Sequence, residues 1–273
     1  MIAVAVKSGQ MGNQLLTKAS ALSLALEYKK DLCFLSTDDE FFDFFKLESE
    51  LVKECNITYK RSKSINGLVK IINIFERVTK INLNSNSINL RENKLFLMTK
   101  WSYKDDKIFV KHLNEIRSYF AFDETIDKKC SEIINQIRKK SSKLIAVHFR
   151  RGDYKNFHNG IWYYSEEDYI RWMKSLYRID SDIVFVIFTN EAIDQSKLDG
   201  AEIPYHFMQG SAIEDLCCMS KVDYIMGPPS TYSWWASVIG NVRRCPIDQK
   251  EAIYTFKDFM FLEERVLKNK NLY

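Results

Sequence analysis

The stretch Leu144–Tyr154, LIAVHFRRGDY, predicts a buried strand that ends in two arginines and a turn. Residues 144–149 form the strand, and the Arg-Gly-Asp sequence that follows forms the turn. Side chains alternate between the two faces of a strand, so His148 and Arg150 share the face opposite its apolar side chains. The sequence therefore places a histidine and an arginine side by side at the carboxyl end of a strand.

Two chemical interpretations of the adjacent arginines are open. Arg150 and Arg151 at a strand exit suit a pyrophosphate, because guanidinium groups match phosphate oxygens in a bidentate manner and stay charged. Alternatively, the pair forms salt bridges with nearby carboxylates. His148 is likewise open to interpretation either as a ligand contact or as a buried core histidine.

Strands and helices alternate on both sides of this stretch. Strands are expected at 2–6, 32–35, 95–98, 144–149, 183–188 and 224–226, and helices at 13–30, 68–78, 123–140, 169–176, 212–220 and 230–239. This alternation predicts an α/β fold with parallel sheets and helical crossovers. A polar stop after the helix at 123–140 predicts two domains, 1–140 and 141–273, facing a cleft. Ligands in such sheets bind at the carboxyl ends of the strands.

Composition narrows the functional classes. The 273 residues are 28% charged and 46% hydrophobic, which is an ordinary globular balance. The net charge of +4 is too small to indicate a nucleic-acid-binding protein. No apolar run approaches the ~20 residues of a membrane-spanning helix. The six cysteines show neither a CxxC pair nor zinc spacing, so we expect reduced, buried thiols.

Two further segments could bind an anion. Ser8–Gln14, SGQMGNQ, connects the first strand to the first helix, where Asn13 is expected as the N-cap. Gly227–Trp235, GPPSTYSWW, follows a later strand, and Ser230, Thr231 and Ser233 could bind phosphate or simply cap the next helix. The first segment has neither Walker A nor GxGxxG spacing. In both segments a plain capped turn is the alternative.

Together, three motifs resemble one family. They are GxxGNQ at 9–14, HxRRGDY at 148–154 and SxxSWW at 230–235. In this order they are similar to the α-1,2-fucosyltransferases of glycosyltransferase family 11, and residues 101–103 and 116–120 look like the middle region of that family. The sequence departs from the family where an aromatic residue is missing after Gln14 and where Gly227-Pro228-Pro229 precedes the last motif. These changes leave room for another acceptor, linkage or GDP-sugar.

The resemblance implies an inverting, metal-independent transfer of L-fucose from GDP-β-L-fucose to a glycan hydroxyl, O2 of a terminal galactoside. It also implies a GT-B-like pair of Rossmann-type domains, with the acceptor on the side of the first and the donor bound mainly by the second. No cofactor or metal is expected. The partners would be a GDP-sugar and a glycan, not a nucleic acid. We expect a cytoplasmic enzyme, and its basic balance is compatible with peripheral contact at the inner face of a membrane.

The family pattern also implies roles for single residues. The donor site would consist of Asn13, His148, Arg150, Arg151, Asp215, Ser230, Thr231 and Ser233. In it the two arginines would hold the pyrophosphate, and Arg150 would stabilise charge on the departing GDP. His148 and Asp215 would contact guanine, since a carboxylate can accept hydrogen bonds from both N1–H and N2–H.

The sequence leaves the identity of the general base open. Inversion by direct displacement needs a group that deprotonates the acceptor hydroxyl. Asp153 is the nearest acidic residue by motif and is predicted to be catalytic, either as this base or as a brace for the arginines. Glu191 is a second candidate. Two rival functions are a transferase that uses another GDP-sugar and a nucleotide- or glycan-binding protein that has lost catalysis.

Overall fold

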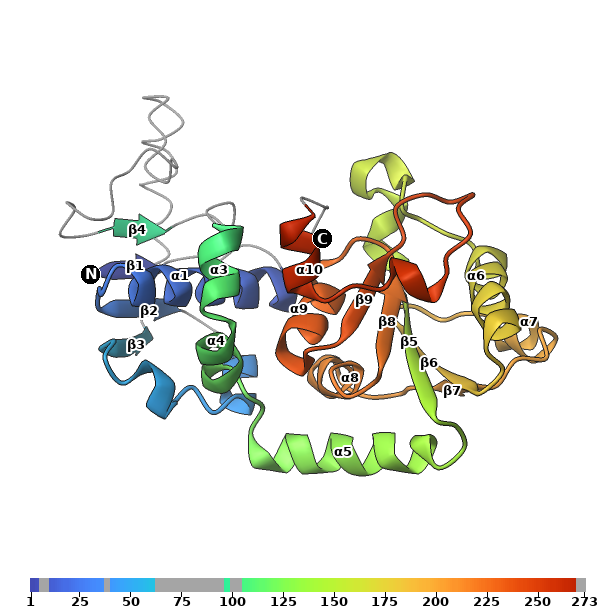
Figure 1. The fold of residues 1–273 in the computed structure, drawn as a ribbon, viewed down its shortest axis with the longest axis horizontal. Helices are drawn as coiled ribbons and strands as arrows, with labels where there is room; N and C mark the ends of the chain where they lie inside the picture. Colours follow the sequence, from blue (N-terminus) through green and yellow to red (C-terminus); the bar gives the residue numbers. More distant parts are fainter. Residues whose placement is uncertain (5–9, 37–39, 62–95, 99–104, 269–273) are drawn as a thin grey trace. The chain divides into compact units, whose positions relative to one another are not determined.

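The computed structural model describes residues 1–4, 10–36, 40–61, 96–98 and 105–268. It divides into two compact units, Met1–Ala121 and Phe122–Tyr273, and each is described by itself (Figure 1). The sequence placed the division after residue 140. Helix α5 (Glu124–Arg138) instead lies in the second unit, where it packs against helix α8 (Ala212–Met219). The helix expected at 68–78 and the segment 101–103 lie outside the described residues.

The first unit contains a four-stranded parallel sheet in the order β3-β2-β1-β4. Its strands are β1 (Ile2–Val4), β2 (Leu32–Ser36), β3 (Ile57–Arg61) and β4 (Phe96–Met98). Ala3 is in register with Cys33 on one side and with Leu97 on the other. Three of the four strands were predicted; β3 was missed, because polar residues interrupt its short apolar pattern.

Helix α1 (Met11–Glu27) forms much of the core of the first unit. Every residue from Leu15 to Ala25 is buried, which is typical of a helix covered on all sides. Even Lys18 is buried, with its ammonium group 3.6 Å from the centre of the Phe42 ring. The remaining described helices of this unit are η1 (Glu40–Phe44), η2 (Glu50–Val52), α3 (Asp106–Lys111) and α4 (Leu113–Tyr119).

The second unit contains a five-stranded parallel sheet in the order β7-β6-β5-β8-β9. The strands are β5 (Lys143–Phe149), β6 (Ile183–Thr189), β7 (Tyr205–Phe207), β8 (Tyr224–Gly227) and β9 (Arg243–Pro246). The chain runs outward from β5 to β7 and then returns to β8 on the other side of β5. The order therefore reverses between β5 and β8, and such a switch point is where ligands bind in open α/β sheets.

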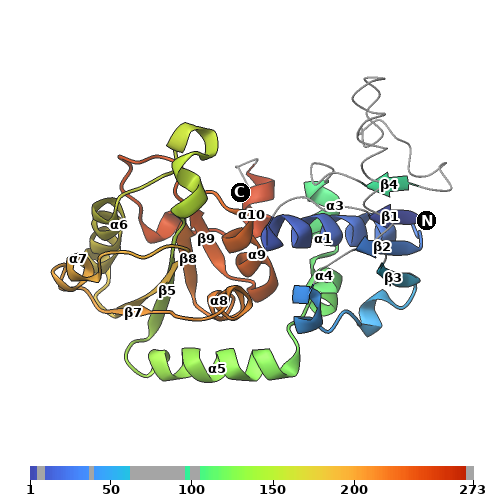
Figure 2. The ribbon, with the colours of Figure 1, turned by 180° about the vertical axis from the view of Figure 1, so that it is seen from behind.

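Helices cover both faces of this sheet. Helices α6 (Glu166–Ile179) and α7 (Gln195–Asp199) lie on one side, and α8 and α9 (Thr231–Gly240) lie on the other (Figures 1 and 2). The unit also contains η3 (Gly152–Lys155), η4 (Phe157–Gly160), η5 (Phe256–Asp258) and α10 (Leu262–Leu267).

The apolar face predicted for β5 packs under α6. Ile145, Val147 and Phe149 belong to one buried cluster with Trp172 and Leu176 of that helix. The Phe149 ring stacks on a further residue of α6, with its centroid 3.9 Å from the ring of Tyr169. This packing fixes β5, so the opposite face of the strand and its carboxyl end are rigidly placed.

Two expectations about the whole chain can be compared with the structure. All six cysteines are buried free thiols, as predicted. In the ranges that the structure describes, no helix is both long enough and apolar enough to cross a membrane.

Candidate functional site

The switch point brings the ends of β5 and β8 together. Val147 of β5 is in register with Met226 of β8, and the next residue, Gly227, passes very close to His148. A Cβ atom at Gly227 would lie 2.7 Å from the His148 carbonyl oxygen, and its φ of +156° also favours glycine. Arg150 and the residues before α9 therefore follow the carboxyl ends of two adjacent strands, β5 and β8.

Arg150 is bound by Asp153 and packs near an aromatic ring. Its Nη2 lies 2.9 Å from Oδ1 and 3.0 Å from Oδ2 of Asp153, and its guanidinium carbon lies 5.4 Å from the centre of the Tyr154 ring. The Tyr154 hydroxyl donates to the Pro229 carbonyl at 2.5 Å, which joins this turn to the segment after β8. Both carboxylate oxygens of Asp153 thus face Arg150, which is the geometry of a brace.

Arg151 has a different environment. Its Nη1 donates to Glu166 at 2.8 Å, its Nη2 donates to the Tyr163 hydroxyl at 2.9 Å, and its Nε lies 3.2 Å from Glu191. The side chains of Arg151 and Glu166 are both largely buried. This geometry favours the salt-bridge interpretation for Arg151, and it also places Glu191, the second candidate base, against an arginine. A contact between Arg151 and pyrophosphate stays a prediction.

His148 is buried beside positive charge. Burial, together with the nearby charges of Arg150 and Arg244, lowers the pKa of its imidazole to about 3. The ring is therefore neutral at physiological pH. Its Nδ1 is buried and has no hydrogen-bond partner among the described residues, while its ring lies 5.4 Å from that of Tyr232.

Asp215 presents a second unsatisfied polar atom. Burial raises the pKa of this α8 carboxyl to about 7, with smaller increases from Glu214 and Cys130, while a hydrogen bond with the Gly210 backbone lowers it. Its Oδ1 is buried and has no hydrogen-bond partner within the described ranges. Buried polar atoms are normally paired in native proteins, so such an atom calls for an explanation, and a ligand is one.

Tyr232 links the two groups. Its hydroxyl donates to the Ala212 carbonyl at 2.5 Å, which connects the start of α9 to the first turn of α8. Its ring neighbours His148, and burial, followed by the charge of Asp215, raises its pKa. Tyr232 thus contacts His148 through its ring and, through its hydroxyl, the helix that carries Asp215. A planar heterocycle that offers both donors and acceptors would suit these two orphaned atoms.

The serines of the last motif stabilise α9. Ser230 is the N-cap, and its side chain accepts from the Tyr232 amide at 3.2 Å. Ser233 is fully buried and accepts from Arg244 Nε at 3.2 Å. Thr231 is half-buried in the first turn. The capping interpretation therefore holds for Ser230, and phosphate binding by these three residues stays a prediction.

Arg244 is a buried residue near the site that the sequence did not point to. It lies on β9 beneath the α9 N-terminus, and its Nη2 also approaches the Ser230 carbonyl at 3.5 Å. Burial and the neighbouring Arg265 lower its pKa to about 9. The only sequence signal was the Arg243-Arg244 pair, and β9 itself was not predicted. Its position shows that positive charge extends under the motif at 230–235.

Asn13 is not the N-cap of α1, contrary to expectation. The helix begins at Met11, and Gln10 occupies the N-cap position without a side-chain capping bond. Asn13 lies within the first turn, and its carbonyl accepts from the Thr17 hydroxyl at 2.8 Å. The sequence placed the start two residues late because asparagine favours N-caps. Asn13 belongs to the first unit, and its role toward a donor stays a prediction.

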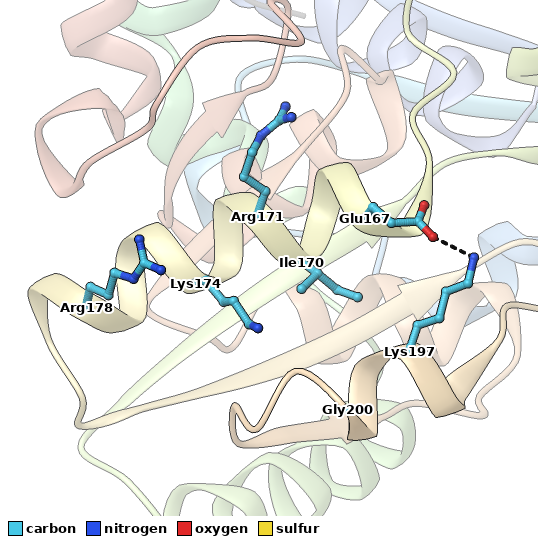
Figure 3. A pocket seen from close by; sticks show the side chains of 7 residues that line it. All are labelled: Glu167, Ile170, Arg171, Lys174, Arg178, Lys197 and Gly200. Carbon is cyan, nitrogen blue, oxygen red and sulfur yellow. Dashed lines mark ion pairs between the residues drawn. The ribbon is translucent and has the colours of Figure 1, made fainter.

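A cavity of about 480 Å³ lies on the outer side of α6 and α7 (Figure 3). It is lined by Glu167, Ile170, Arg171, Lys174, Arg178, Lys197 and Gly200. Lys197 lies 2.7 Å from Glu167, so part of its positive charge is already paired. None of the residues predicted for the site lines this cavity.

The family of the chain follows from comparison with known proteins. Residues 95–268 match the model of glycosyl transferase family 11, and this match covers more than half of the chain. The chain therefore belongs to glycosyl transferase family 11. A comparison with curated proteins found no match.

Solved structures share the fold. The NodZ α-1,6-fucosyltransferase soaked with GDP-fucose has a TM-score of 0.62 and 12% identity, and the alignment covers 93% of this chain and 97% of that one. A second structure, the fucosyltransferase NodZ from Bradyrhizobium, has a TM-score of 0.60 and 13% identity, and the alignment covers 90% of this chain and 94% of that one. POFUT1 in complex with GDP-fucose has a TM-score of 0.61 and 12% identity, and the alignment covers 93% of this chain and 96% of that one. The predicted GT-B-like α/β fold with two parallel sheets is confirmed.

Proposed function

We propose that this protein transfers L-fucose from GDP-β-L-fucose to a hydroxyl of a glycan acceptor. Family membership supports a glycosyltransferase, and the structures with which the chain shares its fold include fucosyltransferases prepared with GDP-fucose. A shared fold does not define a reaction, so the site must support it. The observation that carries the proposal is the position of Arg150 at the β5–β8 switch point, beside His148, whose buried Nδ1 has no hydrogen-bond partner among the described residues.

In this proposal Arg150 acts on the leaving group. The acceptor hydroxyl gives its proton to a base or to water, and its oxygen bonds to C1 of fucose while the bond from C1 to the β-phosphate oxygen breaks, so negative charge builds up on GDP. A guanidinium held close by stabilises that charge in the transition state more than in the substrate. The charge on Arg150 is permanent, so it can stabilise the leaving group in the place of a metal ion. We therefore propose that the transfer is independent of metal.

Asp215 and His148 identify the base of the donor. A carboxylate at Asp215 would accept from guanine N1–H and N2–H, which would satisfy its orphaned Oδ1. Neutral His148 would form one hydrogen bond with the nucleotide through Nδ1. Uracil offers no comparable pair of adjacent donors, so these contacts would favour a guanine nucleotide.

Asp153 orients Arg150 in this proposal. The bidentate contact holds the guanidinium at the strand exit, and the half-exposed carboxylate remains near the reacting centre. The inverting course, transfer to O2 of a terminal galactoside, and a cytoplasmic location are further parts of the proposal that come from the family resemblance.

The experiment that tests the proposal measures GDP release from GDP-fucose, with and without lactose, by the purified chain. We expect GDP release to rise when lactose is present and to fall by at least roughly 100-fold in Arg150→Ala, because one transition-state charge contact is lost. Arg178→Ala, which removes an arginine from α6, is the matched control and should keep wild-type turnover. Wild-type turnover in Arg150→Ala would overturn the assigned role.

A further inference from the structure

A row of aromatic side chains leads from Arg150 to the protein surface. The Tyr154 ring, next to the guanidinium, lies 5.2 Å from the Phe157 ring, which lies 5.9 Å from that of Trp162. The His158 ring fills the angle between the last two, 4.4 Å from Phe157 and 5.3 Å from Trp162. We call these four residues the aromatic ladder. It begins at the buried Tyr154, its Phe157 and His158 rings are exposed, and Trp162 is half-buried against the core.

The exposed end of the ladder is apolar. Phe157 is 44% exposed, and Ile161, in the turn between Phe157 and Trp162, is 60% exposed. Single exposed apolar residues are common, but a group of them beside a candidate site is typical of a ligand-binding surface. Phe157 is connected to Arg150 through the Tyr154 ring, so a ligand that covers Phe157 lies close to the proposed reacting centre.

The turn that carries the ladder has an unusual backbone and is anchored on both sides. His158, Asn159 and Gly160 have φ values of +47°, +57° and +76°, so three successive residues adopt the left-handed conformation. For the first two this conformation is costly, and it persists only where neighbouring contacts impose it. On either side of this turn, the Tyr154 hydroxyl donates to the Pro229 carbonyl and the Tyr163 hydroxyl accepts from Arg151.

We propose that the aromatic ladder binds a sugar ring of the acceptor glycan. A pyranose ring has an apolar face of C–H groups and a polar rim, and a flat aromatic ring can cover that face with little loss of conformational freedom. The half-exposed Asp153 could accept from a hydroxyl on the rim. This inference rests on the proposed function and adds the acceptor subsite to it. The alternative occupant, a second copy of this chain, is an outcome of the test.

The test measures glycan binding without catalysis. Labelled wild-type protein, Phe157→Ala and Phe157→Leu are applied to an array of neutral oligosaccharides that includes lactose and other β-galactosides. We expect the wild type to bind and both variants to bind roughly three- to tenfold more weakly, because leucine keeps the apolar character but not the flat face. Ile179→Ala, at a comparably exposed position at the end of α6, should bind as the wild type does.

Two parallel measurements separate the possible failures. Calorimetry with GDP should give the same affinity in all variants, and sedimentation should give the same molecular mass. Equal glycan binding by Phe157→Ala, absence of glycan binding by the wild type, or a wild-type dimer that Phe157→Ala dissociates would each overturn the inference. Absence of GDP binding in the wild type would instead count against the proposed function. The oligosaccharide array would still show whether the aromatic ladder binds a sugar.

Discussion

Arg151 donates from Nη1 to Glu166 Oε1 at 2.8 Å, and this buried ion pair distinguishes it from the arginine beside it. The two residues are adjacent in sequence and identical in chemistry. Arg151 is bound by the largely buried Glu166, by Glu191 and by Tyr163, whereas the carboxylate that contacts Arg150, that of Asp153, is half exposed. We infer that Arg151 stabilises the fold of the turn and that Arg150 serves the donor.

Substitution of each arginine should separate these roles. Arg151→Ala should lower the free energy of unfolding by about 2 kcal/mol, because it removes one of the two cationic partners that the buried Glu166 has within the described part of the chain and leaves Lys197. Arg150→Ala should change it by less than about 1 kcal/mol, since Asp153 is 48% exposed and can be solvated. Urea unfolding of both variants measures this difference. Equal destabilisation by the two substitutions would contradict the division of roles.

Asp153→Asn should distinguish a brace from a general base. An amide still contacts Arg150 but more weakly, so we expect kcat to fall roughly tenfold through misplacement of the guanidinium. The acid limb of the profile of kcat/KM against pH should remain. A loss of roughly 100-fold or more together with disappearance of that limb would identify Asp153 as the base instead.

Donor binding should depend on pH through Asp215. Burial raises the pKa of its carboxyl to about 7, so it is protonated in the free protein below that pH and is a carboxylate above it. Guanine binds the carboxylate in our proposal, so GDP affinity should fall roughly tenfold for each unit of pH below 7 and level off above it. Calorimetry in buffers of different ionisation enthalpy should detect proton release on binding below pH 7.

Asp215→Asn is the control for this dependence. Its GDP affinity should be weak and independent of pH, because His148, with a pKa near 3, stays neutral across the same range. A wild-type affinity that does not change between pH 5.5 and 8 would contradict the assignment of Asp215. The raised pKa also predicts that the contribution of this group to stability falls as pH rises from about 4 to 7, since the folded chain retains a proton that the unfolded chain releases.

Gly210→Ala should displace Asp215 without affecting the rest of the fold. A Cβ atom at this glycine would lie 2.7 Å from Asp215 Oδ1, and the carboxylate would have to move. We expect GDP affinity to fall roughly tenfold and the midpoint of thermal unfolding to stay within a few degrees. Gly200→Ala, at the C-terminus of α7, is the matched control and should bind GDP normally. Unchanged affinity in Gly210→Ala would show that Asp215 does not contact the ligand.

Much of the framework could be predicted from sequence, because hydrophobic periodicity determines long elements. The apolar run at 183–188 and the helical spacing at 123–140 correspond to β6 and α5. The short edge strands β7 and β9 were missed, since three or four residues carry little periodicity. The division after residue 140 was placed at a polar turn, whereas packing of α5 on α8 places that helix in the second unit.

Those parts of the site that lie within one continuous sequence motif could be predicted. Residues 148–154 were identified as a unit, and the structure gathers Arg150, Asp153 and Tyr154 there. The partners that distinguish Arg150 from Arg151 come from α6 and from the end of β6, so their contacts arise only in the folded chain. The same holds for Tyr232 and Arg244, whose positions depend on how α8, α9 and β9 pack.

Calorimetric titration with GDP-fucose, GDP, GDP-mannose and UDP, with and without EDTA, tests the central claim most directly. The account predicts that GDP and GDP-fucose bind, that UDP does not, and that EDTA changes neither affinity. Arg150→Ala should weaken GDP binding while the protein remains folded. Preference for UDP or GDP-mannose, or the absence of nucleotide binding in the wild type, would contradict a GDP-fucose site at the β5–β8 switch point.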